Sequence, residues 1–160
     1  MFFERGRRGF TLIEIMIVIA ITGLLAALAI SFLLRARINA NEGAVKSDLR
    51  TFSSACESYR LAQDPPLYPA NIAALIASAE GPSYLDNSWG EGQQKHGFIM
   101  NYASVPASSY SLLATPSSSA GINTFCIDQT GIMSGSTADG TATIPAGDVA
   151  GCIGGMALGG

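Results

Sequence analysis

Apolar positions form one long, nearly unbroken run close to the amino end of the chain. Residues 10–34 read FTLIEIMIVIAITGLLAALAISFLL, and Glu14 is their one charged residue. Arginines flank the run, at Arg5, Arg7 and Arg8 before it and at Arg35 and Arg37 after it. About 20 helical residues cross a ~30 Å hydrocarbon core, and a helix that is apolar on every face does not suit a small soluble domain. The pattern predicts a membrane-spanning helix whose first arginines stay in the cytoplasm, with the rest of the chain on the far side.

After this run the pattern becomes that of an amphipathic helix. Within residues 35–63 the apolar positions follow steps of seven, four, three, four and three, at Ile38, Val45, Leu49, Phe52, Cys56 and Tyr59. These spacings place them on one helical face. The helix is therefore predicted to continue to about Gln63, where the sequence Asp64-Pro65-Pro66 stops it. Such a helix would use its apolar stripe to hold a head domain.

Residues 64–97 are predicted to connect this helix to the head. A short apolar patch at residues 72–76 indicates a small helix within the connection. Tyr84, Leu85 and Trp89 are expected to anchor it on the core of the head, whereas the sequence from residue 87 to residue 97 has the composition of a solvent-facing loop. His96, between a lysine and a glycine, is interpreted as a surface histidine.

The periodicity shortens to that of β-strands within residues 98–134. Strand-like runs occur at residues 98–102, 110–114, 124–128 and 132–133, separated by Pro- and Ser-rich turns. Three or four antiparallel strands with one apolar face would cover the helical stripe. Residues 135–160 are rich in glycine and are expected to be irregular. The predicted fold class is therefore α+β, with a long N-terminal helix packed against a small antiparallel β-sheet head.

Composition and charge exclude several classes of protein. A chain of 160 residues, 48% hydrophobic and 13% charged, has room for one ordinary domain and is not a disordered chain. Beyond Arg60 one basic residue, Lys95, faces seven acidic residues, so direct binding of nucleic acid is disfavoured. No nucleophile beside a base, phosphate loop or Cys/His metal spacing is present. We therefore expect no enzyme activity, cofactor or metal.

Acidic residues late in the chain do not change this expectation. Asp128, Asp139 and Asp148 are the last three acidic residues of the sequence, but their spacing matches no calcium-binding loop.

The three cysteines allow one disulfide. A Cys126–Cys152 bond would enclose 25 residues and contribute roughly 3–4 kcal/mol by restricting the unfolded chain, and an envelope location would permit it. Cys56, inside the helical stripe, would then be a buried free thiol. Pairing of Cys56 with Cys126 is the alternative if strand and helix place them opposite each other. We favour Cys126–Cys152.

Two ordinary interpretations of the apolar run are a cleaved secretory signal and a twin-arginine signal. Ala27-Leu28-Ala29 offers a cleavage pattern for the first, and Arg7-Arg8 offers the arginine pair of the second. Glu14 argues against both, because a carboxylate in a hydrocarbon-spanning helix is costly to insert. The run is also longer than a signal core requires.

The residues at the start of the run resemble a known signal. Arg8-Gly9-Phe10-Thr11-Leu12-Ile13-Glu14, followed by the apolar run, is similar to the class III signal and N-terminal helix of type IV pilins and related pseudopilins. The resemblance implies that a prepilin peptidase cleaves between Gly9 and Phe10, removes the leader at residues 1–9 and methylates the new amino group of Phe10. It also implies that Phe10, Thr11, Glu14 and Gly23 serve assembly.

Physical chemistry suggests why the apolar run keeps Glu14. A helix that starts at Phe10 has unpaired N–H groups, a partial positive end and a free α-amino group, one turn away from Glu14. In a stack of subunits the Glu14 of one chain can therefore meet the terminus of a neighbour. The alternative is that Glu14 caps its own helix or reaches the membrane interface. Gly23, with small residues around it, lets helices approach closely.

The resemblance implies a structural subunit of a type IV pilus that serves adhesion, motility or DNA uptake. It would be an inner-membrane precursor before it joins an extracellular filament with copies of itself or related pilins, through an inner-membrane assembly platform. The first alternative is a pseudopilin of a type II secretion system. The second is a membrane-anchored or secreted small binding domain that does not polymerise.

Overall fold

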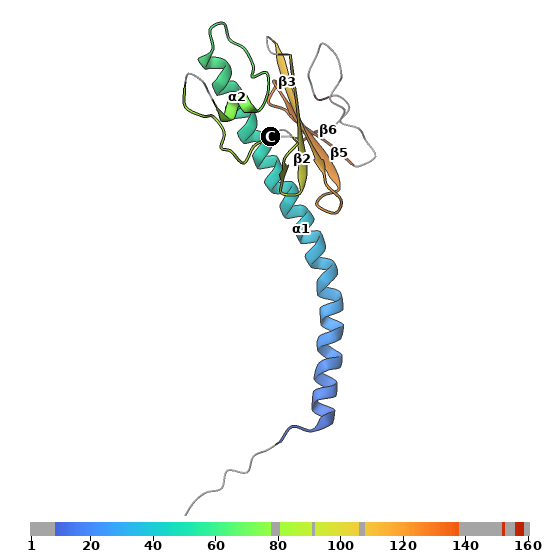
Figure 1. Ribbon diagram of the computed structural model, residues 1–160. Coiled ribbons are helices and arrows are strands. Elements are labelled where there is room, and N and C mark those ends of the chain that lie inside the picture. The colour runs from blue at the N-terminus through green and yellow to red at the C-terminus, as the bar shows by residue number, and fades with distance from the viewer. Residues whose placement is uncertain are drawn as a thin grey trace, which may run out of the picture. The chain divides into compact units, whose positions relative to one another are not determined.

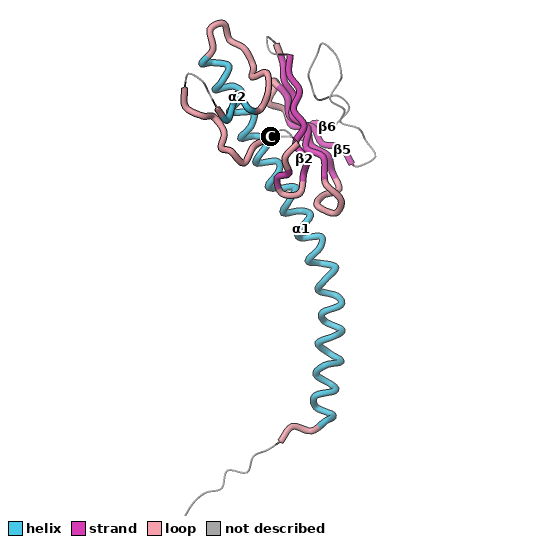
Figure 2. Tube along the Cα trace, in the orientation of Figure 1, coloured by secondary structure: helices cyan, strands magenta, loops and turns pink. Residues whose placement is uncertain are grey.

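The computed structural model describes residues 9–77, 81–90, 92–105, 108–137, 152 and 156–158. The chain divides into two compact units, one up to Ala36 and a head from Arg37 onward, and each is described by itself. Figure 1 colours the elements along the chain from the N-terminus to the C-terminus, and Figure 2 distinguishes helices from strands. They are α1 (Leu12–Ala62), α2 (Ala73–Ile76), β1 (Gln94–Lys95), β2 (Phe98–Val105), β3 (Ser109–Pro116), β4 (Asn123–Asp128), β5 (Met133–Thr137) and β6 (Met156–Leu158).

Helix α1 carries both patterns read from the sequence. Its first part is the apolar run, and its second part places the apolar stripe on one face. Val45, Leu49, Phe52 and Cys56 of that stripe are fully buried, while the two outermost members are half-buried. The helix ends at Ala62, close to the predicted end and just before the two prolines. The α+β fold with a long N-terminal helix is therefore confirmed.

The sheet is larger than predicted. Within the described residues it has six strands in the order β1-β2-β3-β4-β5-β6, and each neighbouring pair is antiparallel, so the sheet is a simple meander. The predicted strands correspond to β2, β3, β4 and β5, each at least as long as expected. The two edge strands, β1 and β6, were not predicted.

Strand β1 corrects the interpretation of residues 87–97 as a solvent-facing loop. Its two residues, Gln94 and Lys95, pair with the start of β2. The turn between the strands consists of His96 and Gly97, with φ of 50° and 79°. Positive φ at both central residues is the geometry of a two-residue type I′ hairpin, and histidine is one of the non-glycine residues that enter this region.

Strand β6 corrects the expectation that residues 135–160 are irregular. Met133 and Gly135 of β5 pair with Leu158 and Met156 of β6, and β5 itself extends to Thr137. The glycine-rich composition obscured this pairing because the signal in Met156–Leu158 is only three residues long. Most of the remaining tail lies outside the described residues.

The core lies between α1 and one face of the sheet. Alternate residues of the strands face the helix, for example Tyr110, Leu112 and Ala114 of β3, all of which are completely buried. Phe52 of α1 lies at the centre, with its ring 5.4 Å from that of Trp89 and 5.5 Å from that of Tyr102. Aromatic pairs at these separations add specific attraction to the area they bury.

The connecting loop is anchored as the sequence predicted. Leu85 and Trp89 are buried, and Tyr84 packs against the core from a half-buried position, with its ring 5.7 Å from that of Tyr59. The predicted short helix is α2, whose Leu75 is completely buried.

Candidate functional site

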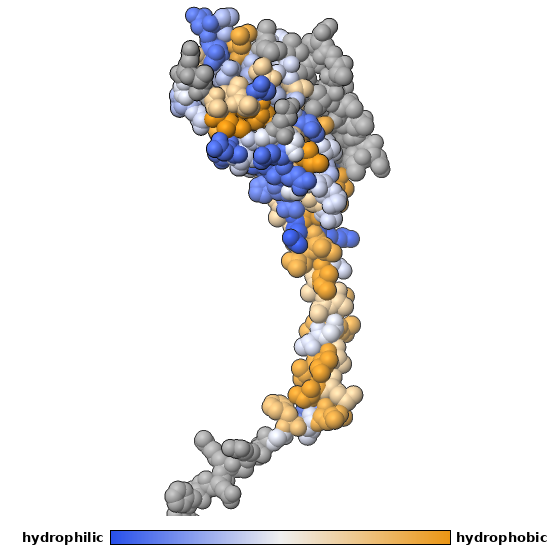
Figure 3. Space-filling model, in the orientation of Figure 1, coloured by the Kyte–Doolittle hydropathy of each residue, from blue (hydrophilic) through white to orange (hydrophobic). Residues whose placement is uncertain are grey.

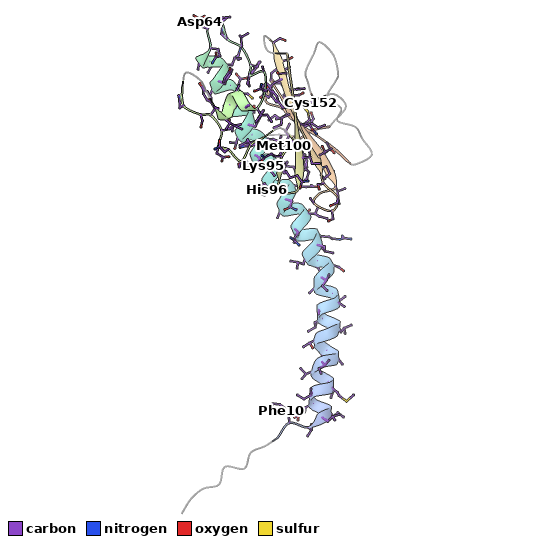
Figure 4. The ribbon with its side chains drawn as sticks, in the orientation of Figure 1. Phe10, Asp64, Lys95, His96, Met100 and Cys152 are labelled. Carbon is purple, nitrogen blue, oxygen red and sulfur yellow. A yellow bond between two sulfur atoms is a disulfide. The ribbon has the colours of Figure 1, made fainter. Side chains whose placement is uncertain are left out.

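The residues that the sequence marks for processing and assembly lie at the start of α1. Gly9, Phe10 and Thr11 precede the helix, and Thr11 is its N-cap residue. The Thr11 backbone N–H and hydroxyl both donate to Oε2 of Glu14, at 2.8 Å each, and the Glu14 backbone N–H donates to the Thr11 hydroxyl at 3.3 Å. This reciprocal arrangement is a capping box, which satisfies backbone donors that a helix start leaves without partners. Figure 4 shows Phe10 at this end of the helix.

The capping box assigns Glu14 a partner inside its own chain. This contact corresponds to the alternative in which Glu14 caps its own helix. It also makes Thr11 the N-cap residue, a role that the sequence analysis did not identify. The signal was present, because Thr-x-x-Glu before an apolar run is the sequence signature of a capping box. Pairing of Glu14 with a neighbouring subunit stays a prediction.

The apolar part of α1 is uncovered on every side within this chain. All side chains of residues 10–34 are exposed, and Phe10 reaches 84%. Figure 3 shows this part of the helix as almost continuously hydrophobic. Helix α1 contains a segment long and apolar enough to cross a membrane, none of it buried. Such a surface needs a lipid or protein partner, because apolar patches of this size are not left in water.

Small side chains open one flank of this segment. A shallow apolar groove of about 680 Å³ is lined by Ala26, Ala29, Ile30, Phe32, Leu33 and Ala36. Gly23 lies one turn earlier, and a methyl group added there would meet nothing within 4 Å. The hydroxyl of Thr22 donates to the carbonyl oxygen of Val18 at 2.7 Å, so its hydrogen bond is satisfied inside the helix and does not require water. The segment therefore offers close approach to another helix, and the Thr22 hydroxyl needs no partner outside its own helix.

Gly9, at the predicted cleavage position, is not demanded by local structure. A Cβ built on Gly9 meets nothing within 4 Å, and its φ lies outside the left-handed region. Within the described residues, the fold therefore places no requirement for glycine at this position.

The head is joined to α1 by a buried carboxylate that the sequence reading missed. Oε1 of Glu42 accepts hydrogen bonds from the backbone N–H groups of Ile122 and Asn123, at 2.9 and 3.1 Å, and the Asn123 side chain donates to both of its oxygens. Beside it, the Asn41 side chain donates to the Ala120 carbonyl at 3.1 Å. We call these contacts the Glu42 clasp. Burial raises the pKa of the Glu42 carboxyl, but the hydrogen bonds from Ile122 and Asn123 outweigh burial and lower the pKa overall.

The cysteines form one of the two pairings considered. Cys126 of β4 is bonded to Cys152, and Cys56 is a buried free thiol whose pKa is raised by burial. The backbone N–H of Cys152 also donates to Oδ2 of Asp128 at 3.1 Å. The disulfide and this hydrogen bond together hold the chain that leads into β6.

Metal ligands do not gather within the described residues. No group of three or more His, Cys, Asp or Glu side chains is positioned to hold an ion in that part of the chain. Asp139 and Asp148 lie outside it. His96 is exposed, with Nε2 3.4 Å from Oδ2 of Asp48 on α1.

Comparison with known proteins identifies the family. The sequence model described as the prokaryotic N-terminal methylation motif matches residues 5–30. The chain is 31% identical to the type II secretion system core protein G of Klebsiella pneumoniae over 126 residues, which cover 79% of this chain and 87% of that protein. The chain belongs to the type IV pilin and pseudopilin family. The family that residues 8–14 resemble is thereby confirmed.

Two further relatives match over about half of this chain. The chain is 45% identical over 73 residues to the type IV wide pilus major component PilA4 of Thermus thermophilus, covering 46% of this chain and 54% of that protein. It is 39% identical over 80 residues to the core protein G of Klebsiella michiganensis, covering 50% and 55%. The chain thus spans about half the length of these two relatives. No solved structure gives a significant match.

Proposed function

We propose that this pilin-like structural subunit is processed between Gly9 and Phe10 and polymerises through residues 10–34. The observation that carries the proposal is an apolar helix with every side chain exposed, which begins at a capping box around its one acidic residue, Glu14. A lipid bilayer satisfies such a helix before assembly, and the same surface of other subunits satisfies it afterwards. The apolar helix and the pilin relatives are consistent with membrane anchoring.

The capping box supports storage of the precursor in the inner membrane. An ionised side chain without partners is costly in an apolar medium. Glu14 has two donors from Thr11, and these stay with the mature chain because cleavage after Gly9 removes neither residue. Processing creates a free α-amino group on Phe10, which precedes Glu14 by four residues in the sequence. A prepilin peptidase is the partner in this step.

During assembly, Glu14 exchanges its internal hydrogen bonds for the methylated amino group of a neighbour's Phe10. An ion pair with a cation is stronger in low-dielectric surroundings than the hydrogen bond to a neutral hydroxyl that it replaces. The groove beside Ala26 and Ala29 and the open side of Gly23 then allow close packing of adjacent helices. An inner-membrane assembly platform is the partner that brings subunits together.

Two filaments fit this mechanism. The match to PilA4 supports the subunit of a type IV pilus, as the sequence analysis proposed, with adhesion, motility or DNA uptake as its role. The alignment with protein G of Klebsiella pneumoniae supports the alternative of a type II secretion filament, because it extends over most of the chain, including much of the head. The two filaments are distinguished by deleting the gene for this chain and measuring both sheared surface filaments and secreted enzyme levels. Loss of filaments with normal secretion supports the pilus.

The assembly mechanism is tested with Glu14→Ala and a matched control, Thr11→Ser, which keeps the hydroxyl. We expect Glu14→Ala to insert in the membrane and be processed, yet to be absent from filaments, and Thr11→Ser to assemble normally. Normal incorporation of Glu14→Ala would exclude the inter-subunit pair. A mature terminus after Ala29, in a soluble product, would instead support the non-polymerising binding domain.

A further inference from the structure

The part of α1 that belongs to the head has one side that no other described residue covers. The apolar stripe of this part is buried against the sheet (Figure 1). Exposed residues recur along the uncovered side at steps of four, three, four, four and three, which is the spacing of one helical face. We call them the outer face: Gly43, Ser47, Arg50, Ser54, Ser58 and Leu61.

The outer face lacks most of the side chains with which a helix usually meets water. Glycine costs an α-helix ~1 kcal/mol relative to alanine, and serine is also a weak helix former, whereas lysine and glutamate favour the helix. At the far end of the face Leu61 is 77% exposed. The composition therefore suits contact with another surface better than exposure to water.

The hydroxyls of the outer face do not require water as a partner. The Ser54 hydroxyl donates to the carbonyl oxygen of Arg50 at 3.1 Å, and the Ser58 hydroxyl donates to that of Ser54 at 2.9 Å. A hydroxyl without a partner is costly to bury, and these internal hydrogen bonds remove that cost. An apolar helix can therefore cover this face.

One charged residue lies on the outer face, and its charge is opposite to the one charge of the apolar run. Arg50 is exposed and belongs to neither of the two ion pairs that the described residues form. Glu14 is the single charged residue of residues 10–34. A carboxylate has two oxygens, so Glu14 can accept from an arginine and from a second cation at the same time.

The two surfaces match in spacing when these charges are placed side by side. Arg50 follows Glu14 by 36 residues, which is about ten turns at ~3.6 residues per turn. Two parallel copies of α1 offset by this amount, about 54 Å at ~1.5 Å per residue, therefore bring corresponding rows of side chains together. In this register Val18 lies beside Ser54, Thr22 beside Ser58 and Leu25 beside Leu61.

From this charge complementarity we propose that the outer face of one subunit receives residues 14–25 of a second copy of the chain in the filament, with Arg50 bound to the Glu14 of that copy. The inference rests on the proposed function and deepens it, because it names a partner for Glu14 besides the amino group of Phe10. A filament stacks copies at successive levels, so each apolar run has the heads of other copies beside it as well as their runs.

The charge pair is tested by the yield of sheared filaments from cells that produce one variant each. We expect Arg50→Glu to lower the yield at least about tenfold, because it places two carboxylates together. Arg50→Lys should keep at least about half of the yield, because it keeps the charge but not the planar fork. The matched control is Arg37→Glu, which reverses another exposed cation of α1 and should assemble normally. Membrane levels and urea unfolding check that each variant is inserted and folded.

Cysteine cross-linking tests the register without changing either charge. Val18→Cys combined with Ser54→Cys should give disulfide-linked oligomers in oxidised filaments. Either variant alone should not, because Cys56 is buried and the other two native cysteines are bonded to each other. Val18→Cys combined with Ser47→Cys is the matched control, since Ser47 lies about 10 Å along the same face from Ser54, beyond the reach of a disulfide.

Each other outcome overturns the inference in a recognisable way. If Arg50→Glu assembles like the wild type, or if the first cysteine pair gives no oligomers in filaments, the contact is excluded, while loss of Glu14→Ala from filaments still supports the proposed function. If Glu14→Ala also assembles, the proposed function fails with it. An equal loss for Arg37→Glu would show a general need for positive charge along α1 and would contradict the specific pair.

Discussion

The Glu42 clasp gives the sharpest prediction about the stability of the head. Glu42→Ala removes the shared acceptor of the Ile122 and Asn123 backbone N–H groups and leaves both in a site where Glu42 itself was only 9% exposed. An orphaned buried donor costs ~1–3 kcal/mol, and hydrogen bonds to charged acceptors are worth ~1.5–3 kcal/mol each. Because these figures describe the same contacts, they are not added together. We expect a loss of about 3 kcal/mol in the free energy of unfolding.

The assay is urea unfolding of the full chain in detergent micelles, followed by the fluorescence of buried Trp89. Glu42→Gln keeps one acceptor oxygen in place, so we expect it to lose about 1 kcal/mol. The matched control is Arg50→Ala, an exposed position on α1, where the change should stay within ~0.5 kcal/mol. If Glu42→Ala unfolds at the same urea concentration as Arg50→Ala, the clasp does not hold the head and the reasoning is wrong.

The pH dependence provides a second readout of the same clasp. The folded-state pKa of Glu42 is lower than its ordinary value of 4.5. The stabilisation is therefore complete above the unfolded pKa and is lost as pH falls below about 4.5 towards the folded pKa. We expect the stability difference between the wild type and Glu42→Gln to be constant near neutral pH and to shrink in that acidic window. A difference that grows on acidification would contradict the assignment.

Three further predictions concern the packing and cross-linking of the same chain, and each is measured by the same unfolding assay. Gly121→Ala should lower the free energy of unfolding by about 1–3 kcal/mol, because the added Cβ would overlap the ring of buried Phe98. An unchanged urea midpoint would show that the ring can move aside. Gly43→Ala should raise the free energy of unfolding by about 0.5–1 kcal/mol, because this glycine lies inside α1 and an added Cβ would meet nothing within 4 Å. A lower free energy of unfolding would reveal a contact not seen in the structure. Cys152→Ser should have a free energy of unfolding about 3–4 kcal/mol lower than that of the oxidised wild type. When both proteins are reduced, the two free energies should be nearly equal.

The parts of the fold that depend on local patterns could be read from the sequence. The membrane-spanning run, the apolar stripe through Leu49 and Phe52, and the end of α1 before Pro65 each follow from residues within a few turns of one another. The capping box of Thr11 and Glu14 was equally local, and its signature was available.

The parts that depend on distant pairing could not be read in this way. The partners of Glu42 lie about 80 residues further along the chain, so no local pattern marks it as a buried acceptor. Strand β6 forms from three residues whose composition resembles the rest of the glycine-rich tail, and the bond from Cys126 to Cys152 brings that segment to the sheet. Strand β1 depends on the left-handed conformation of His96, which the composition of its loop concealed.

The central claim is that the chain is cleaved after Gly9 and polymerises through its exposed apolar helix. The most direct measurement is the intact mass and N-terminal sequence of the chain in sheared surface filaments and in membranes. Our account predicts that filament subunits start at a methylated Phe10 and that residues 1–9 occur only in the membrane precursor. Filaments whose subunits still carry residues 1–9 would contradict it, as would a mature protein that is found only in solution without residues 10–34.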